Sequence, residues 1–228
     1  MNHLKLFLLS IGLVLFSIRN YAQSDYKVTD YGAIGDAKKL NTKVLQKLID
    51  RVSQNGGGKI IFPSGVFLTG SIEIKDDVEL HLEHQAILLG SKNPFHYKKI
   101  ESQDTLSNPD NTALISAHLR NNIKITGKGT INGQGGYVAL AMDSLYYVDP
   151  ESYYKISKSY NERRKRPNEG GRPNLIYFNQ TNNIKIKGVT IKNGAEWVTK
   201  IELCDTIEID NIKLKSDVYW NNDGIDLV

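Results

Sequence analysis

The feature that most constrains the fold is a repeat in which one pattern of apolar residues returns after 23 residues. Apolar and polar residues alternate within each copy, which predicts short strands with one buried face. Similar runs begin near Asn122 and near Asp77. The apolar positions of the two clearest copies are Ile184, Ile186, Val189 and Ile191, then Ile207, Ile209, Ile212 and Leu214.

Two or three strands in about 23 residues leave no room for crossover helices, which favours one turn of a solenoid per repeat. We therefore predict an all-β, right-handed parallel β-helix. Because neighbouring strands lie roughly 4.8 Å apart, Ile184 is expected beside Ile207 and Ile186 beside Ile209. An antiparallel β-sandwich also uses short alternating strands, but it does not require a constant spacing.

Two segments depart from the alternating pattern. Apolar residues between Asn41 and Ser53 have helical spacing, with Asn41 as the N-cap and the glycines after Asn55 as the stop. This predicts an N-terminal α-helix that caps the first coil. Residues 136–172 are predicted to form an inserted loop that projects from one side of the solenoid.

The N-terminus predicts export from the cell. Residues 1–22 combine Lys5, an apolar run from Leu6 to Ile18 and a small residue at Ala22, which is the pattern of a signal peptide. The run is shorter than the roughly 20 residues that a spanning helix needs, so no stable membrane insertion is expected. Residues 23–228 are then part of one β-helix domain of a secreted or periplasmic protein.

Composition narrows the partners and the chemistry. Cys204 is the single cysteine, so an internal disulfide is impossible and the residue is expected to be a small core side chain. The net charge of +4 is compatible with an anionic ligand. Without a clustered basic helix, nucleic acid is not an expected partner. The histidines lack metal-ligand spacing, so we predict neither a metal site nor a cofactor.

The densest cluster of polar residues lies at the end of the chain. Asn222, Asp223 and Asp226 surround a glycine where a turn enters an alternating strand. By itself, an Asn-Asp-Gly sequence is an ordinary turn signal.

From Tyr26 onward, an ordered set of blocks resembles glycoside hydrolase family 28, the polygalacturonase family. The motif at 222–226 is similar to the family's Asn-Thr-Asp-Gly-Ile-Asp, with Asn222 in place of Thr. The resemblance implies an inverting hydrolase of pectin-type galacturonan, an acidic plant polysaccharide. It assigns Asp223 to water activation, with Asn222 and Asp226 as substrate contacts. The blocks are residues 28–36, 56–65, 67–70, 125–135, 172–173 and 222–226.

Inverting hydrolysis needs two carboxyl groups roughly 6.5–9.5 Å apart. A partner for Asp223 on the next coil would lie one repeat further on, past Val228. Asp226 is a poor substitute, since three positions along a strand reverse the face. We therefore expect this chain to be inactive on its own. Because its last coil is uncovered, we also expect it to be poorly soluble or to self-associate.

The inserted segment offers further candidates for substrate binding. Arg163, Arg164 and Arg166, with the tyrosines before them, are assigned to attraction of a polyuronate, although a solvated charged loop is the simpler interpretation. Two other functions fit the same scaffold: a polysaccharide lyase that uses Ca²⁺, and a non-catalytic carbohydrate-binding or adhesin β-helix. No oligomeric state is predicted.

Overall fold

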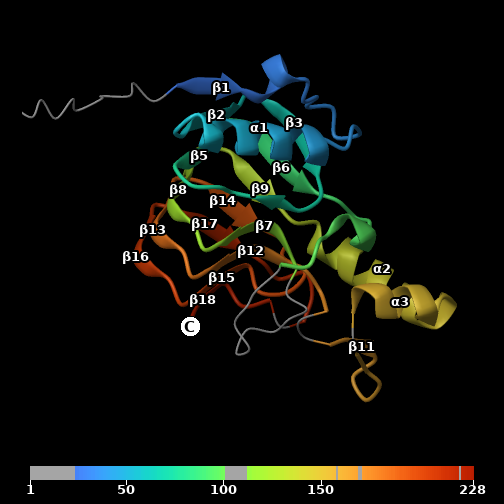
Figure 1. The fold of residues 1–228 in the computed structure, drawn as a ribbon. Coiled ribbons are helices and arrows are strands. Elements are labelled where there is room, and N and C mark those ends of the chain that lie inside the picture. Colours follow the sequence, from blue (N-terminus) through green and yellow to red (C-terminus); the bar gives the residue numbers. More distant parts are fainter. Residues whose placement is uncertain (1–23, 101–111, 158, 169–170, 221) are drawn as a thin grey trace, which may run out of the picture.

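The computed structural model describes residues 24–100, 112–157, 159–168, 171–220 and 222–228 and forms a parallel β-helix (Figure 1). Three parallel sheets run along the solenoid; five coils each contribute one strand to each sheet, and β1 adds a sixth strand to sheet A. Sheet A contains β1 (Asp25–Lys27), β2 (Gly58–Phe62), β5 (Val78–Leu82), β8 (Asn121–Gly127), β13 (Asn182–Lys187) and β16 (Asp205–Asp210). Sheet B contains β3 (Gly65–Thr69), β6 (Ala86–Gly90), β9 (Thr130–Asn132), β14 (Thr190–Lys192) and β17 (Lys213–Lys215). Sheet C contains β4 (Ile72–Glu73), β7 (Ala113–His118), β12 (Asn174–Asn179), β15 (Thr199–Glu202) and β18 (Ile225–Leu227).

The register of the strands confirms the repeat. Ile184 of β13 pairs with Ile207 of β16, and Ile186 pairs with Ile209. All pairings within sheets A, B and C are parallel, which excludes the antiparallel sandwich. The chain is thus the right-handed parallel β-helix that the sequence predicts.

Apolar side chains from the three sheets meet inside the coils. Isoleucines such as Ile115, Ile125 and Ile186 are buried there almost completely. Burial of one such side chain stabilises the fold by roughly 1.5–3 kcal/mol, so the stacked apolar rows hold the coils together.

Helix α1 (Thr42–Gln54) forms where helical spacing predicts it and buries Leu45, Leu48 and Val52. In Figure 1 it lies beside β2 and β3 at the N-terminal end of the coils. Asn41 is the N-cap residue, as the sequence predicts, and its carbonyl accepts from Leu45 N–H at 2.9 Å. Asn41 precedes the helix, but its side chain makes no capping bond and instead contacts Ile34 and the Leu68 carbonyl, which fastens the preceding loop to sheet B.

The segment at 136–172 contains regular structure in its described part, where the sequence predicts a loop. It contains α2 (Gly135–Val148), α3 (Pro150–Ile156) and the antiparallel strands β10 (Tyr160–Asn161) and β11 (Arg166–Pro167). Figure 1 shows α2 and α3 projecting from the side of the coils. Tyr146 stacks on Tyr160 at 3.8 Å between ring centroids, and Tyr153 is fully buried beside them. These aromatic contacts stabilise the helices and hairpin as one unit.

Short 3₁₀ helices are η1 (Val28–Tyr31) and η2 (Pro94–His96). Among the described residues, no helix is both long and apolar enough to span a membrane. The predicted signal peptide lies outside the described residues.

The last coil exposes side chains that are buried in earlier coils. Ile207 and Ile225 are partly open to solvent, while Ile184 and Ile176 at equivalent places are buried. Cys204 is half-buried and lies opposite Thr181, whose backbone N–H donates to its Sγ at 3.4 Å.

Candidate active site

The Asn222-Asp223-Gly224 turn leads into β18 at the edge of sheet C. Its backbone is tied to the preceding coil, because Val198 N–H donates to the Asp223 carbonyl at 2.8 Å and Thr199 N–H to the Gly224 carbonyl at 3.1 Å. The Asn222 amide donates to Ser216 Oγ at 3.1 Å, and that oxygen also accepts from Gly194 N–H. The turn is therefore held on both sides while the Asp223 side chain remains exposed.

Asp226 occupies the next strand position that faces away from the core. It pairs in register with Lys200, which pairs with Tyr177 of β12, which in turn pairs with Ser116 of β7. The alternate positions, such as Ile176, face the core. We call this row the outer ladder of sheet C: Glu73, Ser116, Tyr177, Lys200 and Asp226.

Lys200 is the cation of the outer ladder and the register partner of Asp226. It is buried, and its Nζ lies 3.5 Å from Glu202, 4.4 Å from the Trp197 ring centroid and 5.5 Å from that of Tyr177. The acidic partner and the two aromatic faces hold this ammonium at a fixed place.

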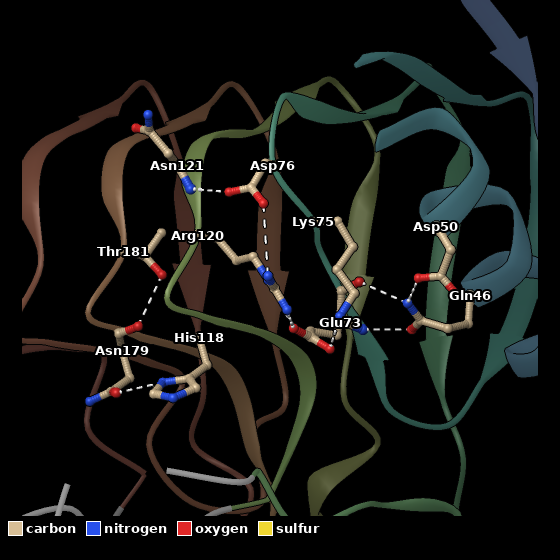
Figure 2. A network of polar contacts seen from close by, with 10 residues as sticks. All are labelled: Gln46, Asp50, Glu73, Lys75, Asp76, His118, Arg120, Asn121, Asn179 and Thr181. Carbon is tan, nitrogen blue, oxygen red and sulfur yellow. Dashed lines mark hydrogen bonds and ion pairs between the residues drawn. The ribbon is translucent and has the colours of Figure 1, made fainter. Parts of the chain in front are cut away.

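Glu202 also accepts hydrogen bonds from neutral donors. Tyr177 donates its hydroxyl proton to Glu202 Oε2, and Asn179 donates its amide to the same oxygen at 3.3 Å. Asn179 Oδ1 lies 2.8 Å from His118 Nδ1, as Figure 2 shows. One row of hydrogen bonds thus crosses three coils and ends beside β18.

A second network in Figure 2 ties sheet C to helix α1. The Gln46 side chain bonds to the backbone of Glu73, and Arg120 donates twice to the Glu73 carboxylate. Burial of the Glu73 carboxyl opposes ionisation, but hydrogen bonds from Lys75 and Arg120 outweigh it and hold the pKa of Glu73 below its usual value. This network fixes the N-terminal end of the outer face.

The three predicted arginines do not gather in one place. Arg163 and Arg164 lie exposed on the turn between β10 and β11. Arg166 is buried, with its guanidinium 5.6 Å from the ring centroid of Trp220, just ahead of the motif. The contact with Trp220 places Arg166 near the turn that carries Asp223.

Arg172 has a structural role at the same turn. It is fully buried and donates to the carbonyls of Ala195 and Trp220, the latter at 2.6 Å. Its guanidinium lies 5.1 Å from the Tyr219 ring centroid. Burial raises the pKa of Tyr219, which keeps this phenol neutral beside the cation.

The sequence model of glycosyl hydrolases family 28 matches residues 53–228. The chain belongs to glycosyl hydrolase family 28.

Relatives of this family 28 chain include an exo-poly-α-D-galacturonosidase from Dickeya chrysanthemi, 40% identical over 119 residues. The match covers 47% of this chain and 19% of that protein. The solved family 28 exopolygalacturonase of Yersinia enterocolitica superposes with a TM-score of 0.72 at 25% identity, over 90% of this chain and 41% of that one. The chain therefore spans less than half the length of either relative.

A relative with a different kind of name is plasmin and fibronectin-binding protein A of Streptococcus pneumoniae. It is 29% identical over 182 residues, which are 78% of this chain and 22% of that protein. Similarity to this family 28 chain thus extends to a protein named for binding.

The sequence alone did not identify Lys200, Glu202 and Tyr177. Their polar atoms alternate with core positions, so the pattern predicted only a solvated face. The repeat did carry a usable signal, because a shift of 23 residues places Lys200 opposite Tyr177 and Glu202 opposite Asn179.

Proposed function

We propose that the protein is a glycoside hydrolase that cleaves pectin-type galacturonan by an inverting mechanism. The observation that carries the proposal is the Asn222-Asp223-Gly224 turn at the edge of a polar sheet face, in a chain of family 28. The names of the galacturonan-cleaving relatives supply the substrate class.

In the proposed reaction, Asp223 acts on the attacking water. Its backbone is anchored and its carboxylate is exposed, as a general base that must reach a water molecule requires. Asp226 and Lys200 lie next to each other on the outer ladder and would contact the sugar that the motif faces. A second carboxyl at about 6.5–9.5 Å would protonate the leaving oxygen.

The remaining sequence-based assignments are part of the same proposal. Asn222 positions the turn through Ser216 and contacts the substrate, while Arg163, Arg164 and Arg166 attract the polyuronate. We also propose that residues 1–22 direct export, so that the protein meets its polysaccharide outside the cytoplasm.

Product analysis tests the reaction type. The complete gene product is incubated with polygalacturonate, and the anomeric signals of new reducing ends are followed by NMR. We expect saturated products with inverted configuration at first appearance. An unsaturated, ultraviolet-absorbing product that disappears with a chelator would indicate a lyase and would refute hydrolysis.

A binding function is the second candidate, because one relative is named for binding plasmin and fibronectin. It predicts retention of galacturonan or a host protein without release of reducing ends. Turnover in the product assay would exclude a purely binding role.

A further inference from the structure

A groove opens between helix α2 and the corners that link sheet B to sheet C. Its volume is about 280 Å³, and it is lined by Asn132, Gln134, Gly136, Tyr137, Leu140, Asn193 and Val218. Asn132, Asn193 and Val218 come from three successive coils, so the groove runs across the stack. Val218 lies on the same connection between β17 and β18 as Asp223.

One side of the groove presents amides in fixed orientations. Asn132 Oδ1 accepts from Asn193 Nδ2 at 3.0 Å and from Gln134 N–H at 3.1 Å. Gln134 Nε2 donates to the Gly90 carbonyl at 2.6 Å. Within the described part of the chain, these bonds leave Asn132 Nδ2 as a donor and Gln134 Oε1 and Asn193 Oδ1 as acceptors.

Two of these residues hold an uncommon backbone conformation. Gln134 has φ 51° and Asn193 has φ 59°, both in the left-handed region. Asparagine tolerates this region well, whereas glutamine does so less readily. The bonds to Asn132 and Gly90 therefore hold Gln134 against a conformational cost, which fixes where its amide points.

The other side of the groove is apolar and unusually exposed. Tyr137 and Leu140 each expose about 60% of their surface, and Val218 also lines the groove. An exposed tyrosine ring and fixed amides in one groove suit a ligand whose own ring has one apolar face and polar edges.

Positive charge lies beside Tyr137, one of the residues that line the groove. The ammonium of Lys92 lies 3.9 Å from the centroid of the Tyr137 ring. The groove also adjoins the N-terminus of α2, whose first turn has no acidic residue. Helix N-termini carry a partial positive charge, so both features favour an anionic occupant.

We propose that this groove binds a uronic acid residue of an acidic glycan as a site separate from the Asp223 turn. The apolar face of the sugar would pack against Tyr137 and Leu140, its hydroxyls would bond to the amides, and its carboxylate would draw the Lys92 ammonium away from the Tyr137 ring. The glycan class rests on the proposed function. A chain held here would be anchored beside the connection that carries Asp223.

The test titrates the protein carrying Asp223→Asn with trigalacturonate and follows backbone amides by NMR. We expect shifts at Lys92, Tyr137 and Leu140. Lys92→Glu should weaken binding at these residues about tenfold, since it replaces attraction by repulsion. Lys47→Glu makes the same charge change on exposed α1 and should leave the affinity unchanged.

Two further titrations define the ligand. Tyr137→Ala should also weaken binding about tenfold, and a neutral galactose trisaccharide should bind much more weakly than trigalacturonate. Equal binding of both sugars, unchanged affinity in Lys92→Glu and Tyr137→Ala, or the absence of shifts in the groove would each overturn the proposal.

The outcome is independent of the hydrolase assignment. If trigalacturonate binds in the groove but the protein releases no reducing ends, the hydrolase assignment is refuted and the proposed groove site stands. Hydrolysis without shifts at Lys92 and Tyr137 would do the reverse.

Discussion

Sheets A and C are built from the same coils, yet their outer faces differ. In sheet A, the strand β13 buries Ile184 and Ile186 and leaves the side chains of Lys185 and Lys187 33% and 49% exposed. In sheet C, every residue of β12 is buried, including Tyr177 and Asn179 on the outer side. Burying a polar group on an outer face lowers the stability of the fold unless the group is hydrogen-bonded. Such buried polar groups commonly mark a functional surface.

The acidic residues of the two faces illustrate the difference. Glu208 on sheet A pairs with Lys185 at 2.7 Å with 53% of its side chain exposed. Glu202 on sheet C pairs with Lys200 and accepts from Tyr177 and Asn179, with only 11% of its side chain exposed. Similar ion pairs should therefore contribute very differently to stability.

The largest expected effect comes from Glu202→Ala, which leaves the Lys200 ammonium buried without its acidic partner. Such a loss destabilises proteins by about 3–5 kcal/mol. Glu208→Ala, the matched change on sheet A, should cost no more than about 1 kcal/mol because water replaces the partner. Urea unfolding measures both, and equal losses would refute the contrast between the faces.

The next effect compares the cores of neighbouring coils. Ile186→Ala should destabilise the fold by about 2–5 kcal/mol, because Ile186 is fully buried. In the polypeptide of residues 1–228, its register partner Ile209 in β16 is only half-buried, so Ile209→Ala should cost clearly less there. A larger loss for Ile209→Ala would show that the last coil packs more tightly than its exposure indicates.

A smaller effect concerns acid stability at the N-terminal end of sheet C. Since the pKa of Glu73 is lowered in the folded state, its contribution is fully present above the carboxyl pKa of the unfolded chain. It is lost as pH falls through the lowered folded value. Glu73→Gln should therefore destabilise the protein near neutral pH, with the difference shrinking in acid.

Unfolding curves of wild type and Glu73→Gln between neutral and acidic pH provide this measurement. Asp25→Asn is a control, since Asp25 is exposed and lies 4.0 Å from its partner Lys59. A stability difference for Glu73→Gln that stays constant with pH would contradict the account.

The repeat allowed the register of sheet A to be predicted because that register depends on local alternation. Ile184 and Ile207 follow it directly. The role of the Asn41 side chain escaped prediction because its partner, the Leu68 carbonyl, lies 27 residues away. The helices at 135–156 were missed although Val138 and Met142 have helical spacing, because apolar residues lie on both the buried and the exposed side of α2 and give no clear polar face.

The candidate site was predictable only in part. The residue types at 222–226 indicated the motif, and the coil geometry places it at the edge of sheet C. Burial of Lys200 and Glu202 was not predictable, because what covers an outer face depends on segments distant in sequence. The arginine run gave no indication of burial, since neighbours in sequence such as Arg164 and Arg166 differ completely in burial.

The central claim is that the carboxylate of Asp223 performs chemistry on a galacturonan, and substitution tests it most directly. Release of reducing ends from polygalacturonate is measured for the complete gene product, for Asp223→Asn and for Asp205→Asn, which changes an exposed acid at the start of β16 in the same coil. We predict a loss of about 10²-fold or more for Asp223→Asn, with folding intact, and no loss for Asp205→Asn. Full turnover in a folded Asp223→Asn variant would contradict the account.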